Sequence, residues 1–179
     1  MMSPYTLTDS EMVLCRTLAN LRTMVNYSTK RPDPARVRLG SEVWSADEMG
    51  VFGEYGFCKL NNIFFDPTTH VRSGGYDFIF RGVRVDMKTT KLPHGKLHGI
   101  TKWQTKPKDV DAYALAILTG NTLAFPGWCS AKFLYQEENL TNFGYDDVYA
   151  IPQSKLRAWK DDEEIENICK RQGGHFSVA

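Results

Sequence analysis

Apolar and polar residues alternate along the segment from Tyr76 to Lys88, and Arg81-Gly82 interrupts the alternation near its middle. A period of two predicts β-strands, and a two-residue break containing glycine predicts the tight turn of a hairpin. In the register that this turn sets, one face is wholly apolar: Phe80 opposite Val83, Phe78 opposite Val85, and Tyr76 opposite Met87. The other face carries Ile79 opposite Arg84 and Asp77 opposite Asp86, with Lys88 two residues further along.

Two stretches upstream have the spacing of amphipathic helices. A capping box at residues 8–11 precedes apolar residues at helical spacing and predicts a helix over residues 9–27 (Leu14, Leu18, Leu21 and Val25). The simpler interpretation is that this helix packs on its own core; the alternative is an arm for docking or dimerisation. A second helix is predicted from Ser41 or Ser45 to about Asn62.

The second helix carries three glycines on one side, Gly50, Gly53 and Gly56. Each glycine costs roughly 1 kcal/mol relative to alanine inside a helix. The stripe therefore indicates a helix backbone pressed closely against a sheet or a ligand. Glu54 lies between these glycines and, taken alone, is more simply a solvated helix residue.

The part of the chain after the hairpin predicts three more strands and a helix. Residues 111–119 are nearly all apolar and are expected to form a central strand, followed by strands over 128–135 and 147–151. Residues 139–144 predict a loop. Ser154 is placed to cap a helix from Lys155, which would continue into the acidic run at residues 161–164.

Length and composition indicate a single globular α/β domain with an added helical arm. The 179 residues divide into an N-terminal helix and linker (1–40), a core (41–152), and a C-terminal helix with a loose tail (153–179). A formal net charge of +1 gives no general attraction to nucleic acid, so any such surface must be local. The four cysteines form no Cys-x-x-Cys pair, which argues against structural zinc and a disulfide framework. With neither a secretory signal nor a membrane-spanning run, we expect a cytoplasmic location and no membrane contact.

The polar face of the hairpin carries the candidate chemistry. Side chains directly opposite in an antiparallel pair have Cβ atoms roughly 4.5–5.5 Å apart, and like charges at that distance are unfavourable. Asp77 opposite Asp86 therefore predicts a cation between them, and Mg²⁺ or Mn²⁺ suits two carboxylates. Together with Lys88, such a site could hydrolyse phosphodiesters. The alternative is a solvated polar face on which these residues have no function.

A basic segment follows the hairpin directly. Between Met87 and Lys108 the chain has six lysines, two histidines and no acidic residue. Prolines and glycines make it loop-like, and it predicts a flap that contacts phosphates regardless of sequence (Lys91, Lys96, Lys102, Trp103, Lys106 and Lys108). The alternative is a solvated basic loop. Zinc binding by His94 and His98 is disfavoured, because the glycine and proline near them argue against a shared helix.

Three short motifs together resemble the PD-(D/E)XK nuclease superfamily: Gly-Glu54-Tyr-Gly, Gly75-Tyr-Asp77 and Val85-Asp86-Met-Lys88-Thr-Thr. The resemblance covers about residues 41–135, with Tyr76 in place of the proline of the pattern. It implies a restriction-endonuclease-like core with a central mixed sheet of α-β-β-β-α-β order flanked by helices, plus the extra N-terminal helix. It also implies metal binding by Asp77, Asp86 and the backbone carbonyl of Met87, with Glu54 reaching the metal directly or through water and Lys88 as the catalytic lysine.

The leading expectation is thus a Mg²⁺- or Mn²⁺-dependent DNA endonuclease. One alternative is a non-catalytic module that binds nucleic acid or protein on the same fold, for example a phage or mobile-element factor acting in the host cytoplasm. Another is a nuclease that uses the same residues on RNA. A homodimer is conceivable through the N-terminal helix.

Overall fold

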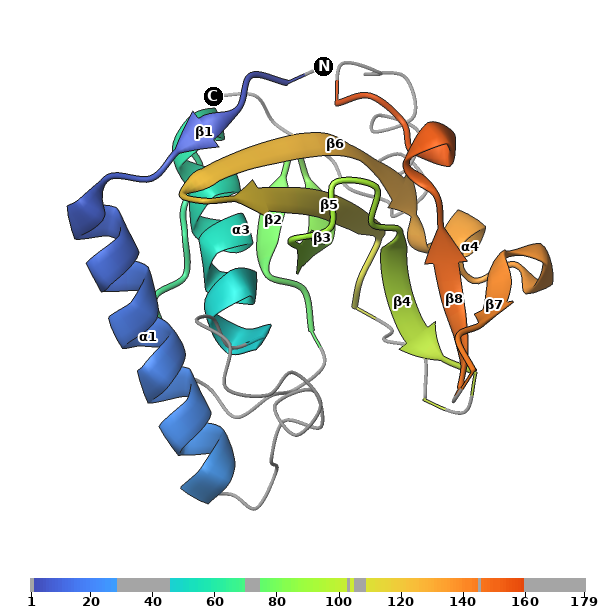
Figure 1. Ribbon diagram of the computed structural model, residues 1–179, viewed down its shortest axis with the longest axis horizontal. Coiled ribbons are helices and arrows are strands. Elements are labelled where there is room, and N and C mark those ends of the chain that lie inside the picture. Colours follow the sequence, from blue (N-terminus) through green and yellow to red (C-terminus); the bar gives the residue numbers. More distant parts are fainter. Residues whose placement is uncertain are drawn as a thin grey trace.

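The computed structural model describes residues 2–28, 46–69, 75–102, 104, 109–144 and 146–159. These residues form a mixed α/β fold with a curled mixed sheet (Figure 1). In chain order the elements are β1 (Tyr5–Thr6), α1 (Asp9–Ser28), α3 (Ala46–Asn61), β2 (Phe78–Phe80), β3 (Val83–Thr90), β4 (Leu97–Thr101), β5 (Ala112–Thr119), β6 (Thr122–Ser130), α4 (Ala131–Leu134), η1 (Glu137–Asn139), β7 (Leu140–Asn142), β8 (Asp147–Ile151) and η2 (Gln153–Lys155).

The main sheet has five strands in the order β1-β6-β5-β3-β2. Its third strand is β5, which confirms the central position expected from its apolar run, and β3 and β5 are parallel while the other neighbours are antiparallel. Helix α3 covers one face of this sheet. The close approach predicted from the glycine stripe is confirmed at Gly53, where a Cβ would overlap Thr89 Oγ1, and at Gly56, where it would overlap Leu123; at Gly50 nothing lies nearer than 3.8 Å.

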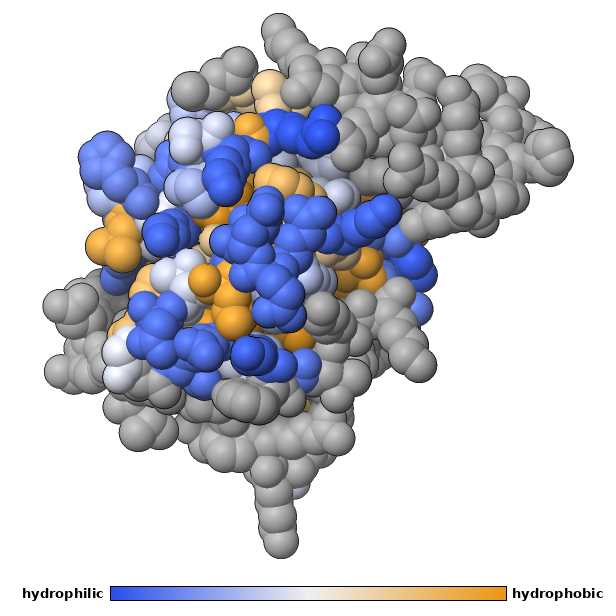
Figure 2. Space-filling view, turned by 90° about the vertical axis from the view of Figure 1, so that its right-hand side faces the viewer, coloured by the Kyte–Doolittle hydropathy of each residue, from blue (hydrophilic) through white to orange (hydrophobic). Residues whose placement is uncertain are grey.

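A second sheet, of order β4-β8-β7, covers the opposite face of the main sheet. Tyr113, Leu115 and Cys129 of the main sheet share a core with Leu97 and Ile151 of the second. The fold therefore has a helical layer, a five-stranded layer and a three-stranded layer. The surface on the side of the second sheet is mainly hydrophilic (Figure 2).

Helix α1 begins at the predicted capping box: Thr8 N–H donates to Glu11 Oε2 at 2.9 Å and Glu11 N–H donates to Thr8 Oγ1 at 3.3 Å. The helix packs on α3, but through Cys15, Leu18 and Ala19. The predicted apolar stripe is therefore wrong at Leu14 and Leu21, which are exposed, and confirmed at Leu18, while Val25 is half-buried. A single neighbouring helix covers only one side of α1, and apolar residues on its outward side stay exposed: Val13, Leu14, Leu21 and Met24. None of the described helices has the length and apolar character needed to span a membrane.

Three predictions at the C-terminal side are wrong. The loop predicted over residues 139–144 contains strand β7, which pairs with β8. The strand predicted over 128–135 is β6, which begins at Thr122 and ends at Ser130, where the Ser130 side chain caps α4. Pro126 and Gly127 disfavour a strand, so the sequence did not indicate that β6 begins at Thr122. The pairing of β6 with β5 accommodates them through a register shift between Leu115 and Ile117 of β5. No helix runs from Lys155 to Trp159, because Arg157 pairs with Trp128 through main-chain hydrogen bonds instead. The acidic run at 161–164 and the tail lie outside the described residues.

The expected α-β-β-β-α-β order also differs from the arrangement in the described part of the chain. After β3 the chain crosses to the second sheet as β4 and then returns to β5, and no helix lies between β3 and β5 among the residues described there. Strand β4 forms five residues, Leu97–Thr101, of the segment expected to be a flexible basic flap. Gln153 anchors the start of this segment, because its side-chain amide donates to Pro93 O at 2.8 Å and Gly95 O at 3.0 Å.

Candidate active site at the edge of strand β3

The hairpin predicted from the alternating pattern forms in the predicted register. Phe78 pairs with Val85, Ile79 with Arg84, and Phe80 with Val83. Arg81 and Gly82 have φ values of 49° and 80°, which matches a two-residue turn with both central residues in the left-handed region. The regular pairs end at Phe78 and Val85; beyond them Asp77 N–H donates to Val85 O at 2.8 Å, so the ladder becomes irregular at Asp77. The predicted pairing of Asp77 with Asp86 stays a prediction.

Strand β2 starts only after Asp77, and the Asp77 carboxylate explains why. Its Oδ2 accepts a hydrogen bond from Met87 N–H at 2.7 Å, in the place where a further strand residue would have supplied a main-chain carbonyl. Because the N–H and C=O of one residue point to the same side of an extended strand, the Met87 carbonyl is directed to the same edge as Asp77. The prediction that Tyr76 pairs with Met87 on the apolar face is wrong, since Tyr76 is 43% exposed.

Asp86 and Lys88 lie on the face of β3 that turns toward the second sheet. The Lys88 ammonium contacts both carboxylate oxygens of Asp86, at 2.6 Å to Oδ1 and 2.9 Å to Oδ2. Tyr113, the neighbour of Asp86 on β5, places its ring centroid 5.9 Å from Lys88 Nζ. The side chain of Asp86 is nearly enclosed, while that of Lys88 is 39% exposed and remains accessible from solvent.

Glu54 reaches the same region from α3. It is only 8% exposed, so the interpretation that it is a solvated helix residue is wrong. Its Oε2 accepts a hydrogen bond from Arg22 NH1 at 2.8 Å, and Arg22 NH2 donates to Asp66 O at 3.1 Å. Sequence analysis missed Arg22, because its partner lies 32 residues away on another helix. The one sequence signal for this pairing is an arginine, Arg22, on the side of α1 that faces α3.

The pKa shifts show that Glu54, Asp77, Asp86 and Lys88 interact electrostatically. Burial, followed by the negative charges of Glu54 and Asp86, raises the pKa of Asp77 well above its ordinary value. Burial likewise raises the pKa of Glu54 and of Asp86, although Arg22 and Lys88 respectively oppose the shift. For Lys88, burial lowers the pKa, but the carboxylates of Asp86, Asp77 and Glu54 outweigh it and the net pKa is raised. The site therefore gathers three buried carboxyl groups around one ammonium, that of Lys88, and one guanidinium, that of Arg22.

The donor set suits a hard divalent cation. Within the part of the chain that the structure describes, no group of three His, Cys, Asp or Glu side chains is arranged to hold a metal ion. Mg²⁺, however, is commonly bound by one or two carboxylates and otherwise by water. Asp77 and the Met87 carbonyl lie at one edge of β3, and Asp86 precedes Met87 on the same strand, so two carboxylates and one carbonyl come from adjoining positions. A cation would compensate these buried carboxylates.

The predicted nucleic-acid contacts are only partly placed. Lys91, Lys96 and Lys102 are exposed: Lys91 directly follows β3, and Lys96 and Lys102 flank β4. Trp103, Lys106 and Lys108 lie outside the described residues. His94 lies in a turn and His98 in β4, so the two histidines do not share a helix.

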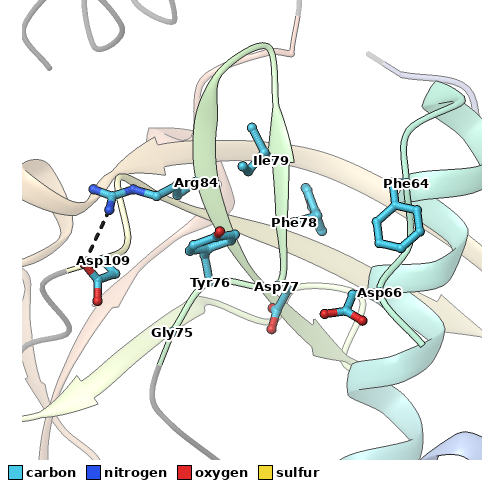
Figure 3. A pocket seen from close by; sticks show the side chains of 9 residues that line it. All are labelled: Phe64, Asp66, Gly75, Tyr76, Asp77, Phe78, Ile79, Arg84 and Asp109. Atoms are coloured by element: carbon cyan, nitrogen blue, oxygen red, sulfur yellow. Dashed lines mark hydrogen bonds and ion pairs between the residues drawn. The ribbon is translucent and has the colours of Figure 1, made fainter. Parts of the chain in front are cut away.

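A pocket of about 690 Å³ opens next to Asp77 (Figure 3). Its walls come from the segment after α3, which carries Phe64 and Asp66, and from the hairpin, which carries Tyr76 and Ile79. Arg84 also lines it, and its guanidinium is held by Asp111 at 2.8 Å and Asp109 at 3.4 Å. The sequence did not indicate this pocket, because the segments that form its walls are not adjacent in the chain.

Comparisons with known proteins identify no relative. No protein-family model matches the chain, and no curated protein or solved structure matches it either. The interpretation of the site therefore depends on its own geometry and chemistry.

Proposed function

We propose that this protein is a divalent-metal-dependent nuclease that hydrolyses phosphodiester bonds in DNA, on a core of the restriction-endonuclease type. The observation that carries the proposal is that three buried carboxylates, of Glu54, Asp77 and Asp86, lie close enough to Lys88 to raise its pKa. Burial raises the pKa of all three carboxyl groups, and the charge of Asp86 adds to the rise for Glu54 and Asp77. Burying that much negative charge is costly unless a cation compensates it. A site retained only for folding would gain nothing from this arrangement.

Each residue has a definite part in the proposed reaction. Asp77, Asp86 and the Met87 carbonyl would hold Mg²⁺ or Mn²⁺. When bound, the ion lowers the pKa of a coordinated water and polarises the phosphate. To coordinate the ion, Asp86 gives up at least one of its two contacts with Lys88.

The raised pKa of Lys88 keeps its amine protonated at neutral pH. Lys88 therefore acts as a donor rather than as a base: its ammonium orients the attacking water or stabilises the charge that develops on the phosphate. Arg22 binds the Glu54 carboxylate at 2.8 Å and opposes the rise in its pKa, which makes Arg22 a positioning residue. The exposed Lys91, Lys96 and Lys102 are available to contact the backbone of the nucleic acid.

One observation favours a second candidate function, a non-catalytic binding module. Because the Lys88 ammonium contacts both oxygens of Asp86, this carboxylate already has a cationic partner without any metal. A nuclease acting on RNA through the same residues is a further form of the first proposal.

Nicking of supercoiled plasmid with and without Mg²⁺ or Mn²⁺ tests the proposal, together with cleavage of branched DNA, single strands and RNA. The metal should be required, and Asp86→Asn and Lys88→Met should lower the rate at least about hundredfold, the usual loss when a charge-stabilising group is removed. Lys155→Ala removes an exposed lysine away from the site and is the control. A wild-type chain that cleaves none of these substrates would favour the binding module.

A further inference from the structure

The side chain of Phe64 is exposed to solvent because the residues on both sides of it pack against the core. It is 79% exposed, although Ile63 before it and Phe65 after it pack against the core. Ile63 N–H donates to Cys58 O at 3.0 Å, and the Phe65 ring meets the Tyr55 ring edge-on at 5.3 Å. Arg22 lies 6.0 Å from the Phe65 ring and also binds Asp66 O. The backbone on both sides of Phe64 is thus fixed, and the aromatic ring is presented to solvent by the fold.

The pocket that Phe64 lines contains further exposed apolar surface. Tyr76 and Ile79, on the hairpin side, are 43% and 51% exposed, and the buried Phe78 also contributes to the lining. In Figure 3 the rings of Phe64 and Tyr76 stand on opposite walls with Asp77 between them. The volume of about 690 Å³ lies within the range of pockets that bind small organic molecules, about 300–1,000 Å³.

The charges of the pocket select what can enter. Asp66, Asp77 and Asp109 contribute carboxylates, whereas its cation, Arg84, already binds Asp109 and Asp111. A phosphate group would be repelled from this lining. A nucleobase is uncharged, stacks on aromatic rings, and carries ring N–H or amino groups that can donate to carboxylates.

From these observations we propose that the pocket binds an unpaired nucleobase of the substrate strand, with Phe64 and Tyr76 as stacking surfaces. This inference rests on the proposed function, because Asp77 belongs both to the candidate metal site and to the pocket wall. A nucleotide whose phosphate lies at the metal has its base within reach of the pocket. In a continuous duplex that base is paired and stacked, so the preferred substrates are single strands, frayed ends and branched DNA.

Binding of a short oligonucleotide that carries 2-aminopurine tests the inference, because stacking on an aromatic ring quenches the fluorescence of this base. The Lys88→Met chain with Mg²⁺ serves as the background, since it should bind without cleaving. Phe64→Leu keeps an apolar side chain but removes the ring, and Phe64→Trp restores an aromatic surface. Met24→Ala is the matched control, because Met24 is also strongly exposed but lies on α1 and lines no part of the pocket.

Single strands should quench the probe, and Phe64→Leu should weaken single-strand binding about tenfold while Phe64→Trp and Met24→Ala bind as the background does. Binding to the continuous duplex should be unchanged by all of these variants. If the Lys88→Met background and its Phe64→Leu variant bind single strands with equal affinity, the proposed base-binding role of the pocket is wrong. This holds even if the wild-type chain nicks plasmid. Ring-dependent quenching in a protein that cleaves nothing supports the pocket and overturns only the catalytic function.

Discussion

Gly50 and Gly53 lie on the same side of α3, yet alanine should have opposite effects at the two positions. At Gly53 an added Cβ would overlap Thr89 Oγ1 and lie 3.2 Å from Met87 Cγ and 3.3 Å from Ala116 Cβ. At Gly50 its nearest neighbour would be Glu54 Oε1 at 3.8 Å, an ordinary contact. The comparison separates the cost of overpacking from the benefit of helix propensity.

The expected magnitudes follow from these distances. Overpacking costs about 1–3 kcal/mol, and alanine recovers up to about 1 kcal/mol relative to glycine inside a helix. Gly53→Ala should therefore lower the free energy of unfolding by about 1 kcal/mol, whereas Gly50→Ala should raise it by about 0.5–1 kcal/mol. The two variants should differ by roughly 2 kcal/mol.

Equilibrium urea unfolding measures this difference. With a slope near 2 kcal/mol per molar urea, the two midpoints should differ by about 1 M. Thr89 Oγ1 is buried without a hydrogen-bond partner among the described residues, so Thr89→Ala removes the overlap without breaking a hydrogen bond. The double variant Gly53→Ala/Thr89→Ala should thus be more stable than the two separate losses imply. A Gly53→Ala protein as stable as Gly50→Ala would refute the close approach of α3 to β3.

Three further variants test the surroundings of the site. Gly82→Ala should destabilise the protein by about 1 kcal/mol in urea unfolding, because residue 82 has a φ of 80°, and an unchanged midpoint would contradict this turn. Arg84→Met removes the guanidinium that faces the buried carboxylate of Asp111, although the main-chain N–H of residue 84 still donates to it. The change should cost about 3 kcal/mol, much of which a double-mutant cycle with Asp111→Asn should assign to the pair. Arg22→Met should raise the pKa of Glu54 further. Since a raised folded-state pKa costs stability as pH rises above the ordinary value of 4.5, the variant should be close to wild type at about pH 5 and clearly weaker at about pH 8; a loss that does not depend on pH would contradict the pairing.

The sequence predicted well what short-range patterns determine. The alternation and the Arg81-Gly82 turn set the hairpin register, which is confirmed for the pairs from Phe80–Val83 to Phe78–Val85. The glycine spacing predicted where α3 presses against the sheet. Both signals depend on residues close together in the chain, so no tertiary information is needed to read them.

The remaining features depend on contacts between distant segments. The partner of Glu54 comes from α1, so a single sequence gave no reason to connect Arg22 with the site. Strand β4 was missed because Gly99 and the flanking Gly95, Lys96 and Lys102 resemble a loop. It becomes a strand only by pairing with β8, some fifty residues later in the chain. The side chain of Asp77 also departs from simple strand geometry, since it bonds to Met87 N–H.

Calorimetric titration of the purified protein with Mn²⁺ or Mg²⁺ measures whether Asp77 and Asp86 bind a divalent cation. We expect saturable binding of the metal ion that is strongly weakened in Asp77→Asn and in Asp86→Asn. Asp109→Asn changes an exposed carboxylate outside the proposed ligand set and should bind the ion as the wild type does. Absence of uptake by the wild-type protein, or uptake unchanged by both aspartate variants, would contradict the proposed metal site.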